Sequence, residues 1–143
     1  MHALLITMSS KRLALIQEDP DALADVVEAR HDQEIPGLLD LGTAWNALDA
    51  LLSEGGKDTI LGDAVLARSG EPFDSDFKSA RLLPPPRVAE IAKTLGALKI
   101  KALAAKHEGD AEEREALELL MKQLAALYTG AAKQQHSILA LLV

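Results

Sequence analysis

Apolar residues follow two kinds of spacing along this chain, and each kind predicts a different element. Nearly continuous apolar runs occur close to both ends, at residues 3–6 and 137–143. Short runs of this kind, bounded by polar residues, are typical of strands that are buried on both faces. Between them, apolar residues recur at three- and four-residue spacing, which predicts helices with one buried side. The pattern therefore predicts helices packed around a small sheet.

Capping residues mark where several helices begin. Ser9 precedes one helical segment, and Asp19 with Pro20 precedes a second, because an N-cap carboxylate followed by proline suits the first helical turn. Asp110, with Glu113 three residues later, begins the longest predicted helix. The apolar stripe of that helix consists of Leu117, Leu120, Leu124, Leu127 and Ala131, with Met121 and Tyr128 beside it.

Residues 79–98 form the clearest single unit of the sequence. Residues 81–83 suit an extended backbone, and the three prolines that follow prevent a strand from continuing. Pro86 can occupy the first position of a helix, because the amide hydrogen that proline lacks has no partner there. The apolar side of this predicted helix consists of Val88, Ile91, Ala92, Leu95 and Leu98.

A strand that leads into a helix packed over it is the unit of an α/β layer. We therefore expect an α/β (α+β-like) fold in a single domain over residues 1–143. The central sheet should have about three strands, formed by the two chain ends and residues 80–83. The terminal strands should pair near its centre, since both are continuous apolar runs.

Four segments resemble, in the same order, those of a known bacterial family. Residues 39–48 read LDLGTAWNAL where the family pattern reads LDLDKAWHAL, and residues 80–92 read ARLLPPPRVAEIA where it reads ARYLTPEEVAEIA. Residues 64–72 and 124–143 resemble its AVLGG segment and its closing helix and strand. The chain is therefore similar to the YfbM-like family over nearly its whole length. The resemblance implies a fold and no activity, because the family has no established general activity.

Composition narrows the classes of partner. The formal net charge is −7 and the pI is about 5.0, and an acidic surface repels nucleic-acid phosphates and anionic lipids. We therefore expect a basic protein as the partner, and neither nucleic acid nor a membrane. The chain has no cysteine, as is typical of a reducing compartment. Because no apolar run approaches the roughly 18 residues of a membrane span, and the N-terminus lacks the basic flank of a signal peptide, we expect a cytoplasmic protein.

The side chains that enzymes use are poorly represented. Cysteine is absent, no serine lies in a G-x-S-x-G elbow, and residues 55–59 lack the spacing of a phosphate-binding loop. In the YfbM-like pattern two histidines often follow the tryptophan, and here those positions hold Asn46 and Asp49. We therefore expect no metal, no cofactor and no catalytic residues. None of the four histidines has a spacing that suits a metal: His2, His31, His107 and His136.

Two side chains within predicted elements are candidates for binding. Trp45 lies on the apolar side of a helix predicted over residues 43–53, where it is either a core residue or a platform for a ligand. Arg81 leads into a predicted strand, where a guanidinium needs a carboxylate or backbone carbonyls to offset its desolvation. Asp63 or Asp49 is the expected carboxylate, although Asp49 is predicted on the polar side of its own helix. The alternative for Arg81 is an anion-binding role.

Residues 57–78 have no regular apolar spacing and are predicted to form a long loop. Phe73 and Phe77 leave two interpretations open. The rings either tuck under the domain as apolar anchors, or one of them is an exposed interface anchor inside an acidic rim. That rim would consist of Glu71, Asp74 and Asp76.

Together these features favour a non-catalytic cytoplasmic protein that binds another protein. An immunity protein that neutralises a basic bacterial toxin is the specific version, because opposite charges accelerate association. The alternative is an enzyme or small-ligand-binding protein with a pocket near Trp45, Asp63 and Arg81.

Overall fold

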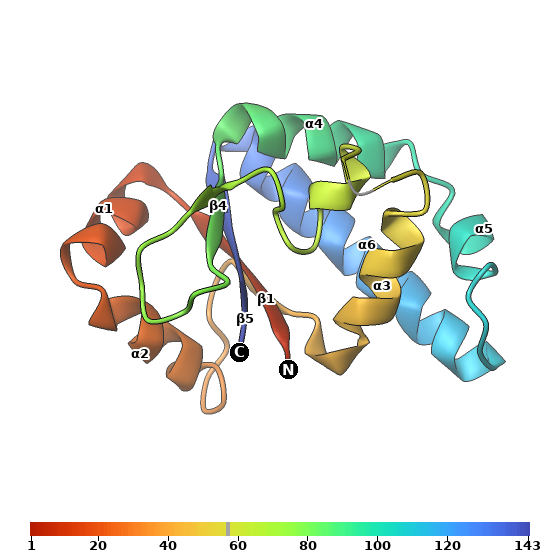
Figure 1. Ribbon diagram of the computed structural model, residues 1–143, viewed down its shortest axis with the longest axis horizontal. Coiled ribbons are helices and arrows are strands. Elements are labelled where there is room, and N and C mark those ends of the chain that lie inside the picture. The colour runs from red at the N-terminus through yellow and green to blue at the C-terminus, as the bar shows by residue number, and fades with distance from the viewer. Residues whose placement is uncertain (57) are drawn as a thin grey trace.

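The centre of the fold is an antiparallel sheet (Figure 1). The structure is a computed structural model that describes residues 1–56 and 58–143. The strands lie in the order β2-β1-β5-β4-β3, and every neighbouring pair is antiparallel. Their bounds are β1 (Ala3–Met8), β2 (Leu38–Asp40), β3 (Glu71–Pro72), β4 (Arg81–Leu83) and β5 (Ser137–Leu142).

The two terminal strands pair at the centre of the sheet, as predicted. β1 and β5 pair along their whole lengths, from Ala3 opposite Leu142 to Met8 opposite Ser137. Residues 138–141 of β5 are each at most 2% exposed. Both faces of these strands are covered, which explains why their sequences are nearly continuous apolar runs.

The sheet has five strands, so the prediction of about three was wrong. The two additional strands, β2 and β3, are three and two residues long and lie at opposite edges. Strands this short give no alternating pattern that sequence reasoning can recognise. Pro72 in β3 argues further against a strand, because proline cannot donate to a ladder and is tolerated only at an edge.

Helices cover both faces of the sheet. α4 begins at Pro85, one residue earlier than predicted, with Pro84 as its extended N-cap. In the part of the chain that the structure describes, no helix combines the length and the apolar character needed to cross a membrane. The helices are α1 (Ser10–Glu18), α2 (Asp21–Ala29), α3 (Trp45–Leu52), α4 (Pro85–Gly96), α5 (Ile100–Ala104) and α6 (Ala111–Lys133), with short 3-10 turns η1 (Gly42–Ala44) and η2 (Leu61–Asp63).

The predicted helix caps are confirmed at both α1 and α6. The Ser9 hydroxyl accepts a hydrogen bond from the amide of Arg12 at 3.1 Å. The Asp110 carboxylate accepts one from the amide of Glu113 at 2.8 Å. Each cap satisfies an amide that the helix itself leaves without a partner, and so fixes where the helix begins.

The sheet separates two apolar cores, because alternate residues of its strands face opposite sides. The larger core lies under α3, α4 and α6 and the smaller core under α1 and α2. Figure 1 shows these two groups of helices on opposite sides of the sheet. The larger core includes Leu5, Leu83, Ile91, Leu124 and Ile138. The smaller core includes Leu4, Ile6, Ile16, Leu23 and Leu139.

Candidate functional site

The long loop predicted over residues 57–78 is interrupted by η2 and by the edge strand β3, and Lys57 lies outside the described residues. Its first part, residues 58–70, contains η2 and passes between α3, α4 and the sheet; we call it the 58–70 loop. Residues 62–65 of this loop are buried. A buried loop must satisfy its backbone polar groups, and here side chains supply several of the partners: Asp63 for the Ser69 amide, Arg68 for the Gly62 carbonyl and Tyr128 for the Ala64 carbonyl.

Asp63 holds one end of the 58–70 loop to the other. Its carboxylate is 2% exposed and accepts hydrogen bonds from the Ser69 amide at 2.8 Å and from the Ser69 hydroxyl. Arg87 of α4 donates to the same carboxylate from Nε at 2.8 Å. Burial alone would raise the pKa of the Asp63 carboxyl, but the Ser69 and Arg87 donors outweigh burial and hold that pKa below its ordinary value.

Asp49 ties the same loop to α3. Its carboxylate receives Arg68 Nη1 at 2.9 Å and Arg68 Nη2 at 2.5 Å, and Nη1 also donates to the Gly62 carbonyl at 2.6 Å. Asp49 lies beside Ser53 on the predicted polar side of α3, yet it is only 8% exposed. The reason is that the loop folds over this side of α3 and supplies a fork-shaped donor to a planar carboxylate.

Arg81 therefore has neither of the carboxylates expected for it. Its Nη1 donates to the Gly70 carbonyl at 3.0 Å, which is the backbone partner that sequence reasoning had left open. In the part of the chain described here, Asp49 pairs with Arg68 and Asp63 with Arg87. The contact to Gly70 depends on glycine, because a Cβ at this position would lie 2.8 Å from the Leu82 carbonyl oxygen.

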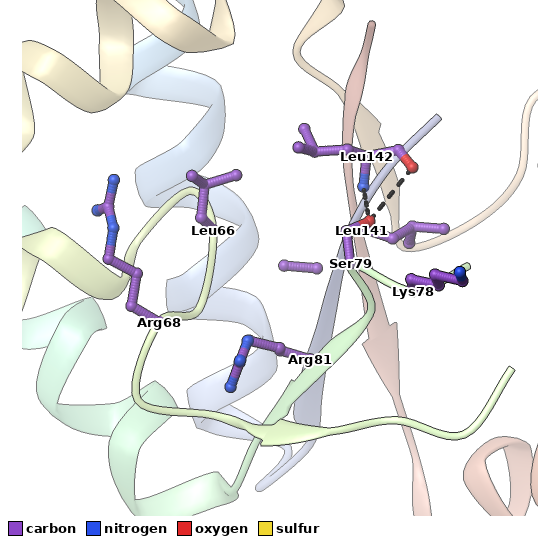
Figure 2. A pocket seen from close by; sticks show the side chains of 8 residues that line it. Leu66, Arg68, Lys78, Ser79, Arg81, Leu141 and Leu142 are labelled. Atoms are coloured by element: carbon purple, nitrogen blue, oxygen red, sulfur yellow. Dashed lines mark hydrogen bonds between the residues drawn. The ribbon is translucent and has the colours of Figure 1, made fainter.

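A cavity of about 270 Å³ lies between the 58–70 loop and the strands β4 and β5 (Figure 2). Figure 2 shows the Arg81 side chain extending from β4 toward this loop, whereas the Lys78 side chain extends in the opposite direction. Ser79 is engaged with the β5 backbone, since its hydroxyl contacts the Leu142 amide at 2.9 Å. The cavity is lined by Leu66, Arg68, Lys78, Ser79, Arg81, Ala140, Leu141 and Leu142.

Trp45 does not form part of this cavity. Its ring is half-buried against the larger core, and its Nε1 donates to the Met1 carbonyl at 3.1 Å. Of the three residues expected around one pocket, Trp45, Asp63 and Arg81, only Arg81 lines this cavity. The Asp63 carboxylate instead receives its donors from Ser69 and Arg87.

The two phenylalanines of the loop lie against the smaller core. Phe73 and Phe77 are both half-buried and pack beside the residues under α1 and α2. This agrees with the interpretation that the rings anchor the loop, and each ring also keeps part of its surface exposed. Three acidic side chains beside them are exposed, namely Glu71, Asp74 and Asp76.

Sequence reasoning missed Arg68 and Arg87, which hold the two carboxylates. Each arginine is far from its carboxylate in sequence, and no local spacing links the two. Within residues 1–56 and 58–143, no three histidine or acidic side chains lie together in a way that could hold a metal ion. Two of the histidines contact single carboxylates at the surface, His2 with Asp40 and His107 with Glu113.

Tyr128 allows its packing against the 58–70 loop to be tested by absorbance spectroscopy. It is the only tyrosine, is fully buried, and donates its hydroxyl to the Ala64 carbonyl at 2.8 Å. Burial, with a smaller contribution from the Asp63 charge, raises the pKa of the Tyr128 phenol above its ordinary value.

A raised folded-state pKa of Tyr128 means that the neutral phenol stabilises the fold below an unfolded pKa of about 10. This stability is lost as the pH rises above that value. We expect phenolate absorbance to appear only together with the loss of helical circular dichroism. Phenolate absorbance near pH 10 in a chain with an intact helical signal would contradict the burial of Tyr128.

The fold and this site together define a small α+β protein in which buried ion pairs hold a long loop against a sheet. The chain belongs to the family described as "Domain of unknown function (DUF1877)", whose model matches residues 1–141. Its fold is similar to that in "The Crystal Structure of a Protein of Unknown Function YfbM from Escherichia coli". The two chains are 18% identical, the TM-score is 0.70, and the match covers 100% of both. No curated protein matches the chain.

Proposed function

We propose that the chain is a non-catalytic protein-binding domain whose partner is a basic protein. The observation that carries this proposal is the distribution of acidic side chains. They gather on the layer that covers the smaller core, formed by α1, by α2 with the loop that follows it, and by β3 with the loop after it; we call it the acidic layer. Its exposed acidic residues are Glu18, Asp19, Asp21, Asp25, Glu28, Asp32, Glu34, Glu71, Asp74 and Asp76.

The acidic layer carries more negative than positive charge. Its ten exposed carboxylates compare with four lysine and arginine residues, Lys11, Arg12, Arg30 and Lys78. Arg30 is itself occupied, because its Nε lies 3.4 Å from the Asp40 carboxylate and its Nη1 donates to the Val27 carbonyl. Such a predominantly acidic surface attracts a basic partner and repels acidic ones, which raises the association rate and the selectivity.

An exposed apolar side chain lies beside these charges. Leu15 on α1 is 56% exposed, and Glu18 follows it by three residues, so the two are neighbours on the helix surface. An apolar contact surrounded by charged residues is a common arrangement at protein interfaces. The acidic layer therefore offers charges that attract a basic partner and an apolar side chain, Leu15, that the partner can bury.

The acidic residues around the start of α6 are a weaker candidate. Glu112 and Glu113 lie in the first turn of that helix, where negative charge stabilises the helix dipole. Glu118 is paired with Lys122 at 3.2 Å. These carboxylates have structural explanations, whereas most of those on the acidic layer have none.

Charge reversal on the acidic layer should abolish capture of the partner. The test variant carries Asp25→Lys, Glu28→Lys and Asp32→Lys, and all three side chains are exposed. Wild-type and variant chains would be immobilised and exposed to an extract of the source cells. We expect the wild type to retain a basic protein that the variant does not.

The matched control reverses three exposed carboxylates elsewhere, Glu108, Glu112 and Glu115, with the same change in net charge. This control should retain the partner. If the acidic-layer variant retained the partner as well as the control did, the assignment of this surface would be wrong. The immunity version predicts in addition that the captured protein arrests growth when expressed alone and does not when this chain is co-expressed.

A small-ligand-binding protein is the second candidate function. The observation that favours it is the cavity beside Arg81, whose guanidinium has a backbone partner in place of the expected carboxylate. Of the pocket expected near Trp45, Asp63 and Arg81, this candidate retains only the arginine.

A further inference from the structure

We infer that the cavity between the 58–70 loop and strands β4 and β5 binds a small organic acid, with its anionic head on Arg81. The head is a carboxylate or a phosphate monoester, and the body is a short aliphatic chain. This inference is independent of the protein partner proposed for the acidic layer, which covers the other core.

The first argument is the chemistry of Arg81. A guanidinium presents five donors, and the structure assigns one of them, Nη1, to the Gly70 carbonyl. The side chain is half-buried, so it has lost part of its hydration. Within residues 1–56 and 58–143, the two buried carboxylates are taken by Arg68 and Arg87. An anion with two oxygen atoms matches the remaining planar fork of donors.

The second argument concerns which cationic side chain at the cavity is available to bind the anionic head of the ligand. Arg68 is held by Asp49 through two hydrogen bonds, so its charge is already neutralised. Lys78 extends away from Arg81 in Figure 2. Arg81 is therefore the side chain that defines where the anionic head lies.

The third argument is the shape and the apolar walls of the cavity. Its volume of about 270 Å³ is just below the range of roughly 300–1,000 Å³ that is usual for ligand pockets, which indicates a ligand of few atoms. Leu66, Leu141 and Leu142 line it beside the arginine. A purely inorganic ion would leave these walls without a partner, and a short aliphatic body would cover them.

The fourth argument is the backbone at the rim of the cavity. Ala67, between two lining residues, has a positive φ of 52° although it is not glycine. Its amide donates to the Asp63 carbonyl at 3.0 Å, and its carbonyl accepts from the Gly70 amide at 2.8 Å. The hydrogen bonds around Asp63 thus hold a strained turn that places Leu66 at the cavity and the Gly70 carbonyl beside Arg81. Strain of this kind is concentrated at binding sites.

Butyrate, acetate and inorganic phosphate are suitable probes. Each would be titrated into the full-length ¹⁵N-labelled chain while the amides of Leu66, Ser79 and Leu142 and the Arg81 side-chain signal are followed. We expect saturable shifts at these positions, with butyrate up to about fourfold tighter than acetate for each methylene that is buried. Butyl phosphate compared with butyrate then identifies the preferred head group.

Arg81→Gln should weaken butyrate binding by about tenfold or more, because it removes a charged donor. Lys78→Gln is the matched control: it removes the same charge at the same cavity and should change the affinity by less than about twofold. Arg81→Gln also removes the hydrogen bond to the Gly70 carbonyl. A second pair of variants, at Leu66, therefore tests the cavity without changing that hydrogen bond. Leu66→Glu should abolish binding by supplying an internal carboxylate, and Leu66→Gln should retain it.

Three results would overturn the inference. The first is the absence of saturable shifts at the cavity with butyrate and butyl phosphate up to tens of millimolar. The second is equal loss of affinity in the Lys78→Gln and Arg81→Gln variants, which would show general charge attraction. The third is equal affinity for acetate and butyrate, which would show that the apolar walls take no part.

Discussion

Removing residues 138–143 is expected to leave a chain that no longer unfolds cooperatively. β5 lies between β1 and β4, so its loss breaks two strand pairings and opens both cores. Full burial of a single Leu or Ile side chain contributes about 1.5–3 kcal/mol. Three such side chains, Ile138, Leu139 and Leu141, are lost together, against a total stability of about 5–15 kcal/mol for a typical domain.

Thermal and urea unfolding followed by circular dichroism would measure this effect. The control is Leu119→Ala, which removes an apolar side chain that is 57% exposed and should change the stability by no more than about 0.5 kcal/mol. A truncated chain that melts as sharply as the wild type, at the same temperature, would show that β5 is not the central strand.

The second large effect is expected for Asp63→Ala, at about 3 kcal/mol or more of lost stability. The substitution removes a buried acceptor that is shared by three donors, the Ser69 amide, the Ser69 hydroxyl and the Arg87 guanidinium, and leaves Arg87 with its contact to Glu90. Asp58→Ala, which removes an exposed carboxylate from the same loop, is the control and should cost less than about 0.5 kcal/mol. Equal small losses in both variants would contradict the role given to Asp63.

The pH dependence of stability tests independently whether the charged Asp63 carboxylate stabilises the fold. Because the pKa of its carboxyl is lowered in the folded chain, the charged form stabilises the fold above an unfolded pKa of about 3.9. This contribution is fully present above that pH and is lost as the pH falls through the lowered folded pKa. Asp63→Asn should therefore show a flatter loss of stability in acid than the wild type. If wild type and Asp63→Asn lost stability in parallel as the pH falls, the lowered pKa of the Asp63 carboxyl would be contradicted.

The parts of the fold that could be predicted from the sequence are those with local signals. The terminal strands have continuous apolar runs, and the caps at Ser9 and Asp110 are single side chains that act on the next helical turn. β2 and β3 could not be predicted, because a strand of two or three residues is defined by its neighbour in the sheet and not by its own sequence.

The charge network could not be predicted for the same reason. Asp49 and Arg68 meet only because the 58–70 loop folds back over α3, and Asp63 meets Arg87 only because α4 packs beside that loop. The sequence did indicate that Arg81 needs a partner and left a backbone carbonyl open. The structure supplies that carbonyl from Gly70, where only glycine can approach the Leu82 backbone closely enough.

The central proposal is that the acidic layer recruits a basic partner by electrostatic attraction. The measurement that tests it most directly is the association rate constant with the captured partner as a function of salt concentration. The Debye length shrinks from about 30 Å at 0.01 M to about 3 Å at 1 M salt, so steering between exposed charges is screened over this range. We expect the wild-type rate constant to fall by at least about tenfold across it, and the Asp25→Lys, Glu28→Lys, Asp32→Lys variant to lose most of that dependence. A wild-type rate constant that stays flat from low to high salt would contradict the proposal.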